Sequence, residues 1–233
     1  MNLCVIPARG GSKRIPGKNI REFCGKPMIA WSIERAIESG AFDKIIVSTD
    51  SSEIAEVAKS YGAEVPFIRP EELADDFTDT LPVIKHAITA MADLGLNYKY
   101  VCCLYATAPF VLVNDLKKGL GCLMNKPIDY AFSVTSYAFP IQRALKVNGN
   151  GGIEMLHPEH RLTRSQDLEE YWHDAGQFYW GAVDAWLSQR KIFSDRSAPV
   201  VLDRYRVQDI DTMADWVRAE LMFKMMQTEG RGN

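Results

Sequence analysis

The residues best suited to chemistry lie in a loop near the N-terminus. An apolar strand expected over residues 3–7 runs into the segment ARGGSKRIPGKN at residues 8–19, which has three glycines and four basic residues. Glycine lets backbone N–H groups approach a ligand closely, and successive N–H groups form a concavity that binds an anion. Lys and Arg add full positive charge, and Arg binds two phosphate oxygens at once. The pattern predicts a cradle for a triphosphate, and the alternative is a solvated, flexible basic turn.

The loop differs from the two commonest phosphate-binding motifs. A P-loop has Gly-Lys followed by Ser or Thr, whereas Asn19 follows Gly17-Lys18 here. A dinucleotide-binding fingerprint has Gly-x-Gly-x-x-Gly at the start of a helix, whereas Pro16 and the residues after it predict a longer, non-helical excursion. We therefore expect a phosphate-binding loop of another kind.

A second chemical pattern is Asp209-Ile210-Asp211, just before a helix expected over residues 213–226. Alternate residues of an extended segment point to the same side, so the two carboxylates would lie next to each other. Neighbouring carboxylates repel unless a cation lies between them, and Mg²⁺ binds carboxylates together with substrate phosphates. The alternative is that Asp211 only caps the helix. Together with a triphosphate loop, the pair predicts Mg²⁺ as cofactor, with Asp209 and Asp211 as its ligands.

The elements that must position these residues alternate along the chain. Further strands are expected over residues 44–48, 65–68, 100–105 and 130–134, and helices over residues 28–37, 52–61, 81–94, 115–124 and 213–226. This order predicts an α/β fold with a mainly parallel sheet flanked by helices, in which ligands bind beyond the carboxyl ends of the strands. The first loop, residues 48–50 and residues 106–109 would all lie at that edge.

Length and composition indicate a single domain over residues 1–233, because 47% hydrophobic and 24% charged residues are ordinary for a globular protein. The alternation stops from residue 139 to residue 171, where Asn148-Gly149-Asn150-Gly151-Gly152 predicts a turn. We expect an inserted arm or flap here, which either makes dimer contacts or is a loose surface excursion.

Charge and hydropathy exclude several partners. The net charge of −3 and the confinement of positive charge to the first loop favour a small anionic ligand and argue against nucleic acid. The sequence shows no membrane span and no signal peptide, so a cytoplasmic location without a membrane partner is expected. The five cysteines lack metal-ligand spacing and predict buried thiols.

The segment IPARGGSKRIPGKN at residues 6–19 resembles the first motif of the CMP-sialic acid synthetase family, whose members are cytidylyltransferases that activate keto-sugar acids. The resemblance covers essentially the whole chain. Residues 69–74 followed by Asp76, Thr78 and Thr80 resemble the cytidine-binding segment of the family, and residues 209–211 match its metal motif. The resemblance implies a Rossmann-like nucleotide-diphospho-sugar transferase fold. It also implies CTP and a nonulosonic acid as substrates, Mg²⁺ as cofactor and a homodimer.

The resemblance also implies roles for individual residues. The expected catalytic residues are Arg9, Lys18, Asp209 and Asp211. The expected nucleotide-binding residues are Ala8, Arg9, Gly10, Gly11, Ser12, Lys18, Asn19, Arg69, Thr78 and Thr80. The expected acceptor-binding residues are Tyr105, Thr107, Arg143, Arg164, Gln166, Ala175, Phe178 and Tyr179. For Arg143 and Arg164 the alternative is a role in surface solubility.

Two departures from the family pattern bear on the acceptor. Where the sialic acid enzymes have Gln-Pro-Thr-Ser-Pro, this chain has Tyr105 at the first position, and where they have Asn-Gly it has Ala175-Gly176. The loss of Gln and Asn predicts a more apolar pocket, which suits a deoxygenated, di-N-acylated sugar. Both substitutions resemble the pseudaminic acid branch.

The expected reaction is therefore transfer of CMP from CTP to the anomeric hydroxyl of a nine-carbon keto-sugar acid, with pseudaminic acid as the expected acceptor and pyrophosphate as the product. One alternative is an N-acetylneuraminate or legionaminate cytidylyltransferase. Another is a non-catalytic nucleotide-binding domain.

Overall fold

A computed structural model describes residues 1–75 and 77–228, so Asp76 of the expected cytidine-binding segment lies outside the described residues. The fold is built on a six-stranded sheet with the order β10-β6-β9-β5-β1-β4. These strands are β1 (Asn2–Pro7), β4 (Lys44–Ser48), β5 (Tyr100–Leu104), β6 (Tyr130–Ser136), β9 (Trp172–Ala182) and β10 (Ser197–Val201). All are parallel except β9, which runs antiparallel to β5 and β6.

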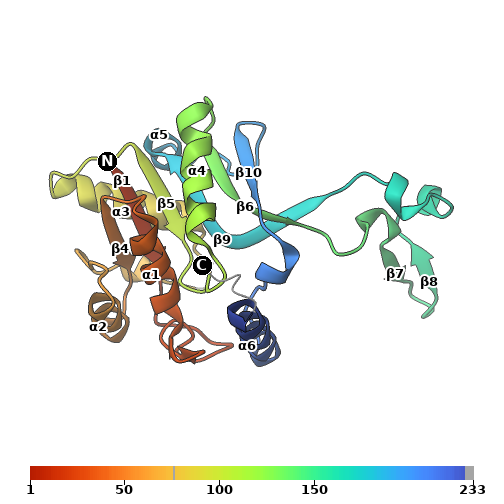
Figure 1. Ribbon diagram of the computed structural model, residues 1–233, viewed down its shortest axis with the longest axis horizontal. Coiled ribbons are helices and arrows are strands. Elements are labelled where there is room, and N and C mark those ends of the chain that lie inside the picture. The colour runs from red at the N-terminus through yellow and green to blue at the C-terminus, as the bar shows by residue number, and fades with distance from the viewer. Residues whose placement is uncertain (76, 229–233) are drawn as a thin grey trace.

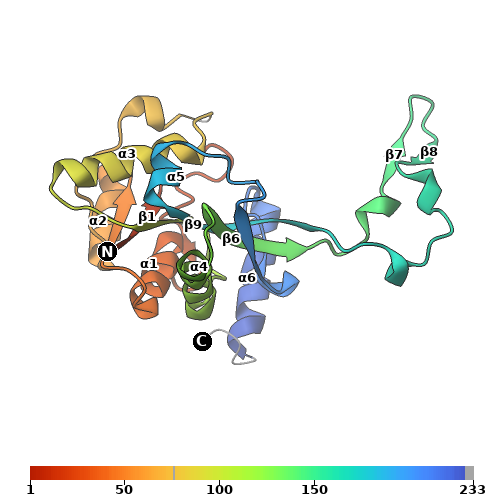
Figure 2. The ribbon, with the colours of Figure 1, turned by 90° about the horizontal axis from the view of Figure 1, so that it is seen from above.

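Helices cover both faces of this sheet, as Figures 1 and 2 show. They are α1 (Met28–Ser39), α2 (Ser52–Ser60), α3 (Thr80–Asp93), α4 (Val113–Asn125), α5 (Val183–Leu187) and α6 (Met213–Thr228). Helices α1 and α4 lie on one face, and α3 and α5 lie on the other (Figure 2). Short 3₁₀ helices cover Glu71–Leu73, Ile141–Arg143, Pro158–His160, Ser165–Asp167 and Arg204–Arg206.

Strand β1 shows why this arrangement follows from the sequence. Its residues Leu3, Cys4, Val5 and Ile6 are all fully buried, as expected for a parallel strand with helices on both faces. Successive side chains point to opposite faces. Accordingly, Cys4 and Ile6 join the cluster beneath α1 and α4, while Leu3 and Val5 join the cluster beneath α3 and α5. The expected α/β fold is confirmed.

Most of the expected elements are present, but the strand expected over residues 65–68 is wrong. Only Glu64 pairs with Ile46, as an isolated parallel bridge. Pro66 has no backbone N–H to donate to a ladder, which limits pairing at this point. Two helix boundaries that the sequence marked with capping residues agree with the structure. Gly40, in the left-handed conformation, ends α1, and the side chain of Ser51 caps the start of α2.

The segment between β6 and β9 extends away from the sheet (Figures 1 and 2). It contains a hairpin of β7 (Leu145–Val147) and β8 (Ile153–Met155). The turn of this hairpin lies at the expected place and is closed by a hydrogen bond of 2.9 Å from the N–H of Asn148 to the carbonyl of Gly152. We call residues 137–171 the arm. Among the described residues, no helix is long and apolar enough to cross a membrane.

Candidate active site

A cavity of 240 Å³ lies at the carboxyl ends of β1 and β5, where the fold places ligands. Its walls come from the loop after β1, from the start of α3 and from the residues that follow β5. Of the residues expected at the site, it is lined by Arg9, Ser12, Lys18, Asn19, Arg69, Thr78, Thr80, Tyr105 and Thr107. Ala8, Gly10 and Gly11 belong to the same loop but do not line this cavity.

The first loop is held in place by neighbouring residues. The backbone N–H of Gly10 donates to Asp50 Oδ1 at 2.8 Å, and the side-chain amide of Asn19 donates to the carbonyl of Arg9 at 3.0 Å. The sequence placed Asp50, two residues after β4, at the ligand-binding edge of the sheet, but it did not predict the hydrogen bond between Asp50 and the first loop. These bonds hold a glycine-containing loop in one conformation before any ligand binds.

Arg69 lines the cavity and is almost fully buried. Its Nε donates to Ser48 Oγ at 3.1 Å, and its terminal nitrogen donates to the carbonyl of Ser48. Burial lowers the pKa of Arg69 to about 10, which leaves the side chain cationic at neutral pH. Ser48 therefore positions a fixed positive charge in the cavity wall.

The structure brings the two chemical patterns of the sequence together. Lys18 Nζ donates to the carbonyl of Ile210 at 2.7 Å, across 192 residues of sequence. Arg14 lies 2.9 Å from one oxygen of Asp211, and Lys18 lies 3.5 Å from the other. Burial, and then the neighbouring Asp211, raise the pKa of Asp209. The segment with the two carboxylates thus lies directly against the basic loop.

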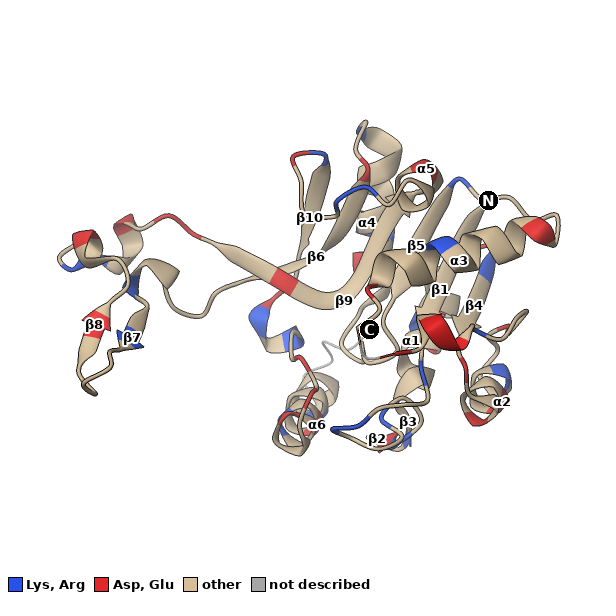
Figure 3. Ribbon diagram, turned by 180° about the vertical axis from the view of Figure 1, so that it is seen from behind, with Lys and Arg blue, Asp and Glu red and all other residues tan. Residues whose placement is uncertain are grey.

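Basic segments of the ribbon gather near this edge, beside the strands β2 (Glu22–Phe23) and β3 (Lys26–Pro27) and between β10 and α6 (Figure 3). Over the rest of the ribbon Lys and Arg are interspersed with Asp and Glu (Figure 3).

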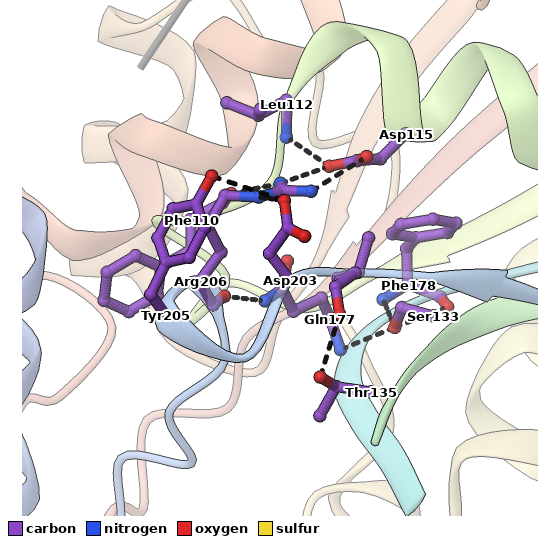
Figure 4. A network of polar contacts seen from close by, with 11 residues as sticks. Phe110, Leu112, Asp115, Ser133, Thr135, Gln177, Phe178, Asp203, Tyr205 and Arg206 are labelled. Atoms are coloured by element: carbon purple, nitrogen blue, oxygen red, sulfur yellow. Dashed lines mark hydrogen bonds and ion pairs between the residues drawn. The ribbon is translucent and has the colours of Figure 1, made fainter. Parts of the chain in front are cut away.

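A buried ion pair positions the segment that leads to Asp209 and Asp211 (Figure 4). Arg206 and Asp115 are 5% and 3% exposed, and they form two hydrogen bonds of 2.6 and 3.3 Å. The side-chain amide of Gln177 donates to the carbonyl of Arg206 at 2.6 Å. Asp115 also accepts the N–H of Leu112 at the start of α4. The chain after β10 is thereby tied to both α4 and β9.

A second cavity, of 480 Å³, adjoins the first and shares Tyr105 and Thr107 with it. The other expected residues in its wall are Ala175, Tyr179 and Asp209. Its wall also contains Ala108, Gly176 and Gln177, which stand in segments that the sequence placed at the site. The residues in its wall that were not expected there are Phe110, His173, Asp174, Val207 and Gln208. The first cavity is lined by several basic residues, and the second is lined by both apolar and polar residues. Because they share part of their walls, the two cavities can hold two substrates next to each other.

Comparison with known proteins agrees with this geometry. A family model described as Cytidylyltransferase matches residues 3–227 of the chain. The chain belongs to the cytidylyltransferase family. It is 46% identical over 224 residues to the "Pseudaminic acid cytidylyltransferase" of Campylobacter jejuni, with 96% of this chain and 97% of that protein covered. It is 31% identical to the "CMP-N,N'-diacetyllegionaminic acid synthase" of Legionella pneumophila, with 97% of each covered.

The fold is also similar to a solved structure of CMP:2-keto-3-deoxy-manno-octonic acid synthetase complexed with CTP. The TM-score is 0.69 at 17% identity, with 96% of this chain and 98% of that chain covered. The family membership inferred from the first motif is confirmed, and the protein is a cytidylyltransferase. An enzyme is thereby supported over a non-catalytic nucleotide-binding domain.

Two tyrosines line the second cavity of the cytidylyltransferase, and one of them, Tyr105, also lines the first. The hydroxyls of Tyr105 and Thr80 are hydrogen-bonded at 2.8 Å, and the hydroxyl of Tyr179 donates to Asp174 Oδ2. The rings of Tyr105 and Tyr179 are 5.5 Å apart. Burial raises the pKa of both phenols, so both stay neutral. Tyr105 is therefore in the wall of both cavities.

Four residues expected to bind the acceptor lie elsewhere in the cytidylyltransferase. Phe178 is fully buried beneath α4, because consecutive residues of β9 alternate between the two faces of the sheet. Arg143, Arg164 and Gln166 lie on the arm and line neither cavity of their own chain. Arg143 donates to the carbonyl of Thr163, and Arg164 pairs with Asp167 at 2.7 Å. Phe178 is thus a core residue rather than a pocket wall.

Proposed function

We propose that this cytidylyltransferase transfers CMP from CTP to the anomeric hydroxyl of pseudaminic acid and releases pyrophosphate. The observation that carries the proposal is the second cavity, which adjoins the basic one and has Tyr105 and Ala175 in its wall. The 46% identity to a pseudaminic acid cytidylyltransferase over nearly the whole length supports the same acceptor.

In this proposal the triphosphate of CTP lies against the first loop. Arg9, Ser12 and Lys18 line the basic cavity and face the phosphates, together with backbone N–H groups of the loop. Asn19, Arg69, Thr78 and Thr80 line the same cavity and bind the cytidine moiety. Because the loop and Arg69 are held by hydrogen bonds of their own, they are positioned for the charge that develops in transfer.

Asp209 and Asp211 fit Mg²⁺. Their side chains supply hard oxygen ligands, and burial and the neighbouring Asp211 raise the pKa of Asp209, so a cation between the two carboxylates would relieve their repulsion. Both residues would hold the ion, which when bound supplies Lewis-acid stabilisation of phosphate oxygens. Lys18, which contacts both the carbonyl of Ile210 and Asp211, keeps this segment next to the phosphate-binding loop.

The reaction depends on the relative positions of the two substrates and needs no covalent intermediate with the protein. The anomeric oxygen forms a bond to the α-phosphorus of CTP, the bond to pyrophosphate breaks in line, and the hydroxyl proton is lost to solvent. The shared wall of Tyr105 and Thr107 places the acceptor cavity against the nucleotide cavity, which favours this alignment.

The direct test is pyrophosphate release from CTP and Mg²⁺ with pseudaminic, N-acetylneuraminic and legionaminic acids in parallel. We expect release with pseudaminic acid at a kcat/KM at least about tenfold above that for the others, since small pocket differences are worth that much. Release with another sugar acid alone would refute the acceptor assignment and leave CMP transfer in place. No release with any of the three would contradict the whole proposal.

We further propose that the protein is a homodimer that uses the arm. Phe139, Val147 and Leu162 on the arm are 82%, 75% and 80% exposed, and large apolar side chains left exposed on a projecting arm favour an interface. Analytical ultracentrifugation at micromolar protein is expected to show a dimer. A variant with Val147 and Leu162 changed to Asp is expected to shift it to monomer. Only monomer in the unaltered protein would contradict the proposal.

A further inference from the structure

We propose that the carboxylate of Asp174 accepts a hydrogen bond from an acyl-amino N–H of the sugar acceptor and so selects for acylated amino sugars. The inference deepens the proposed function and rests on it. Asp174 lines the second cavity and directly precedes Ala175-Gly176, but its residue type and spacing gave it no expected role. Its role is visible only once β9 is folded.

An irregularity in β9 places Asp174 in the cavity wall. Phe132 and Val134 of β6 are two positions apart, yet their partners on β9, Tyr179 and Asp174, are five positions apart. The extra residues form a bulge, and Gly176 within it has a φ of +60°, which glycine adopts without strain. Bulges commonly redirect a side chain next to an active site. Here the bulge brings the side chain of Asp174 within reach of the hydroxyl of Tyr179.

Two hydrogen bonds orient the carboxylate of Asp174, and it can still accept a further one. The N–H of Gly176 donates to Oδ1 at 2.9 Å, and the hydroxyl of Tyr179 donates to Oδ2. An ionised carboxylate offers about four acceptor positions, so these two bonds leave capacity for a further donor. Neither partner is charged, so the negative charge remains, and Asp174 is exposed toward the cavity that it lines.

The charge of Asp174 also constrains how an acceptor can bind. A sugar acid has its own carboxylate, which a fixed negative charge repels. An amide N–H is a donor without charge, and a carboxylate is the stronger kind of acceptor for it. The acceptor is therefore oriented with an acyl-amino group at Asp174 and with its carboxylate directed away from it. The short side chain of Ala175 beside it leaves space for the acyl group.

The test replaces Asp174 with Asn, which keeps the shape but offers one accepting oxygen in place of two. We expect kcat/KM for the acceptor to fall about 10–100-fold, mainly through KM, because a hydrogen bond to a charged group is lost. The KM for CTP should change less than about twofold, since Asp174 does not line the nucleotide cavity. Asp184→Asn, an exposed carboxylate at the start of α5, is the matched control and is expected to behave as wild type.

A substrate series separates direct contact from a positioning role. Analogues in which one acyl-amino group is replaced by an acyloxy group have no N–H to donate. Wild type should lose kcat/KM for one of these analogues, whereas Asp174→Ala, which has no side-chain acceptor, should use that analogue and the amide equally well. If the variant still prefers the amide, or if its kcat/KM for the acceptor is unchanged, the proposal is overturned.

Tyr179→Phe provides a second check, because it removes the donor to Oδ2 and leaves the carboxylate. If Asp174 only held Tyr179, this variant and Asp174→Ala would lose the same activity and neither would alter the preference for the amide. Wild-type turnover with the three sugar acids tests the proposed function separately. If wild type uses a different one of them, the same comparison is made with that sugar, and if it uses none, both proposals fail.

Discussion

Replacement of Asp211 by Asn is expected to lower kcat by on the order of 10³-fold, while the Kd for CTP changes by less than about threefold. Asp211 is held between Arg14 and Lys18, at 2.9 and 3.5 Å, and both of these residues line the basic cavity. With Asp209 it forms the oxygen pair that we propose for Mg²⁺. The loss should therefore fall on the transfer step rather than on binding of the nucleotide.

The measurements are pyrophosphate release at saturating CTP and acceptor, and CTP binding by titration calorimetry. Asp195→Asn, on an exposed loop before β10, is the matched control and should retain wild-type kcat. EDTA should abolish turnover of the wild-type protein, and added Mg²⁺ should restore it. Near-normal turnover of Asp211→Asn would show that the metal assignment is wrong.

Replacement of Arg206 by Met is expected to lower the free energy of unfolding by about 3–5 kcal/mol, because it leaves a buried carboxylate without its cation. Asp115 is 3% exposed and pairs with Arg206 at 2.6 Å. Arg206 Nη1 also donates to the carbonyl of Phe110, which lines the acceptor cavity. Activity should fall as well, since the chain that follows Arg206 leads to Asp209.

Urea denaturation gives the free energy, and Arg204→Met is the matched control, because Arg204 is exposed on the same 3₁₀ helix. That variant should lose less than about 1 kcal/mol, as is usual for surface positions. The double variant Arg206→Met with Asp115→Leu should recover part of the loss, because it removes the unpaired charge. An effect of Arg206→Met as small as that of Arg204→Met would contradict the importance of the pair.

The elements with the strongest local signals are predicted correctly from the sequence. The run of apolar residues in β1 predicted a strand buried on both faces, and Gly40 and Ser51 predicted a helix end and a helix start. The expectation for residues 65–68 failed because Pro66 interrupts this apolar run and has no backbone N–H to donate to a ladder. Phe178 failed as a pocket residue because the sequence did not show which face of β9 meets α4.

The sequence by itself determined the chemistry available to this protein: a glycine-rich basic loop after a buried strand, a pair of carboxylates before the last helix, and a family motif that identifies a cytidylyltransferase. These features depend on residue types and short spacings, so they can be recognised in the sequence without knowledge of the fold. Only the tertiary structure decided that Lys18 contacts Ile210 and Asp211, that Arg206 is anchored to Asp115, and that Asp174 lies in the second cavity. The first two are contacts between residues far apart in the chain, and the third depends on a bulge in the pairing of β6 and β9. All three form only when the whole sheet is assembled.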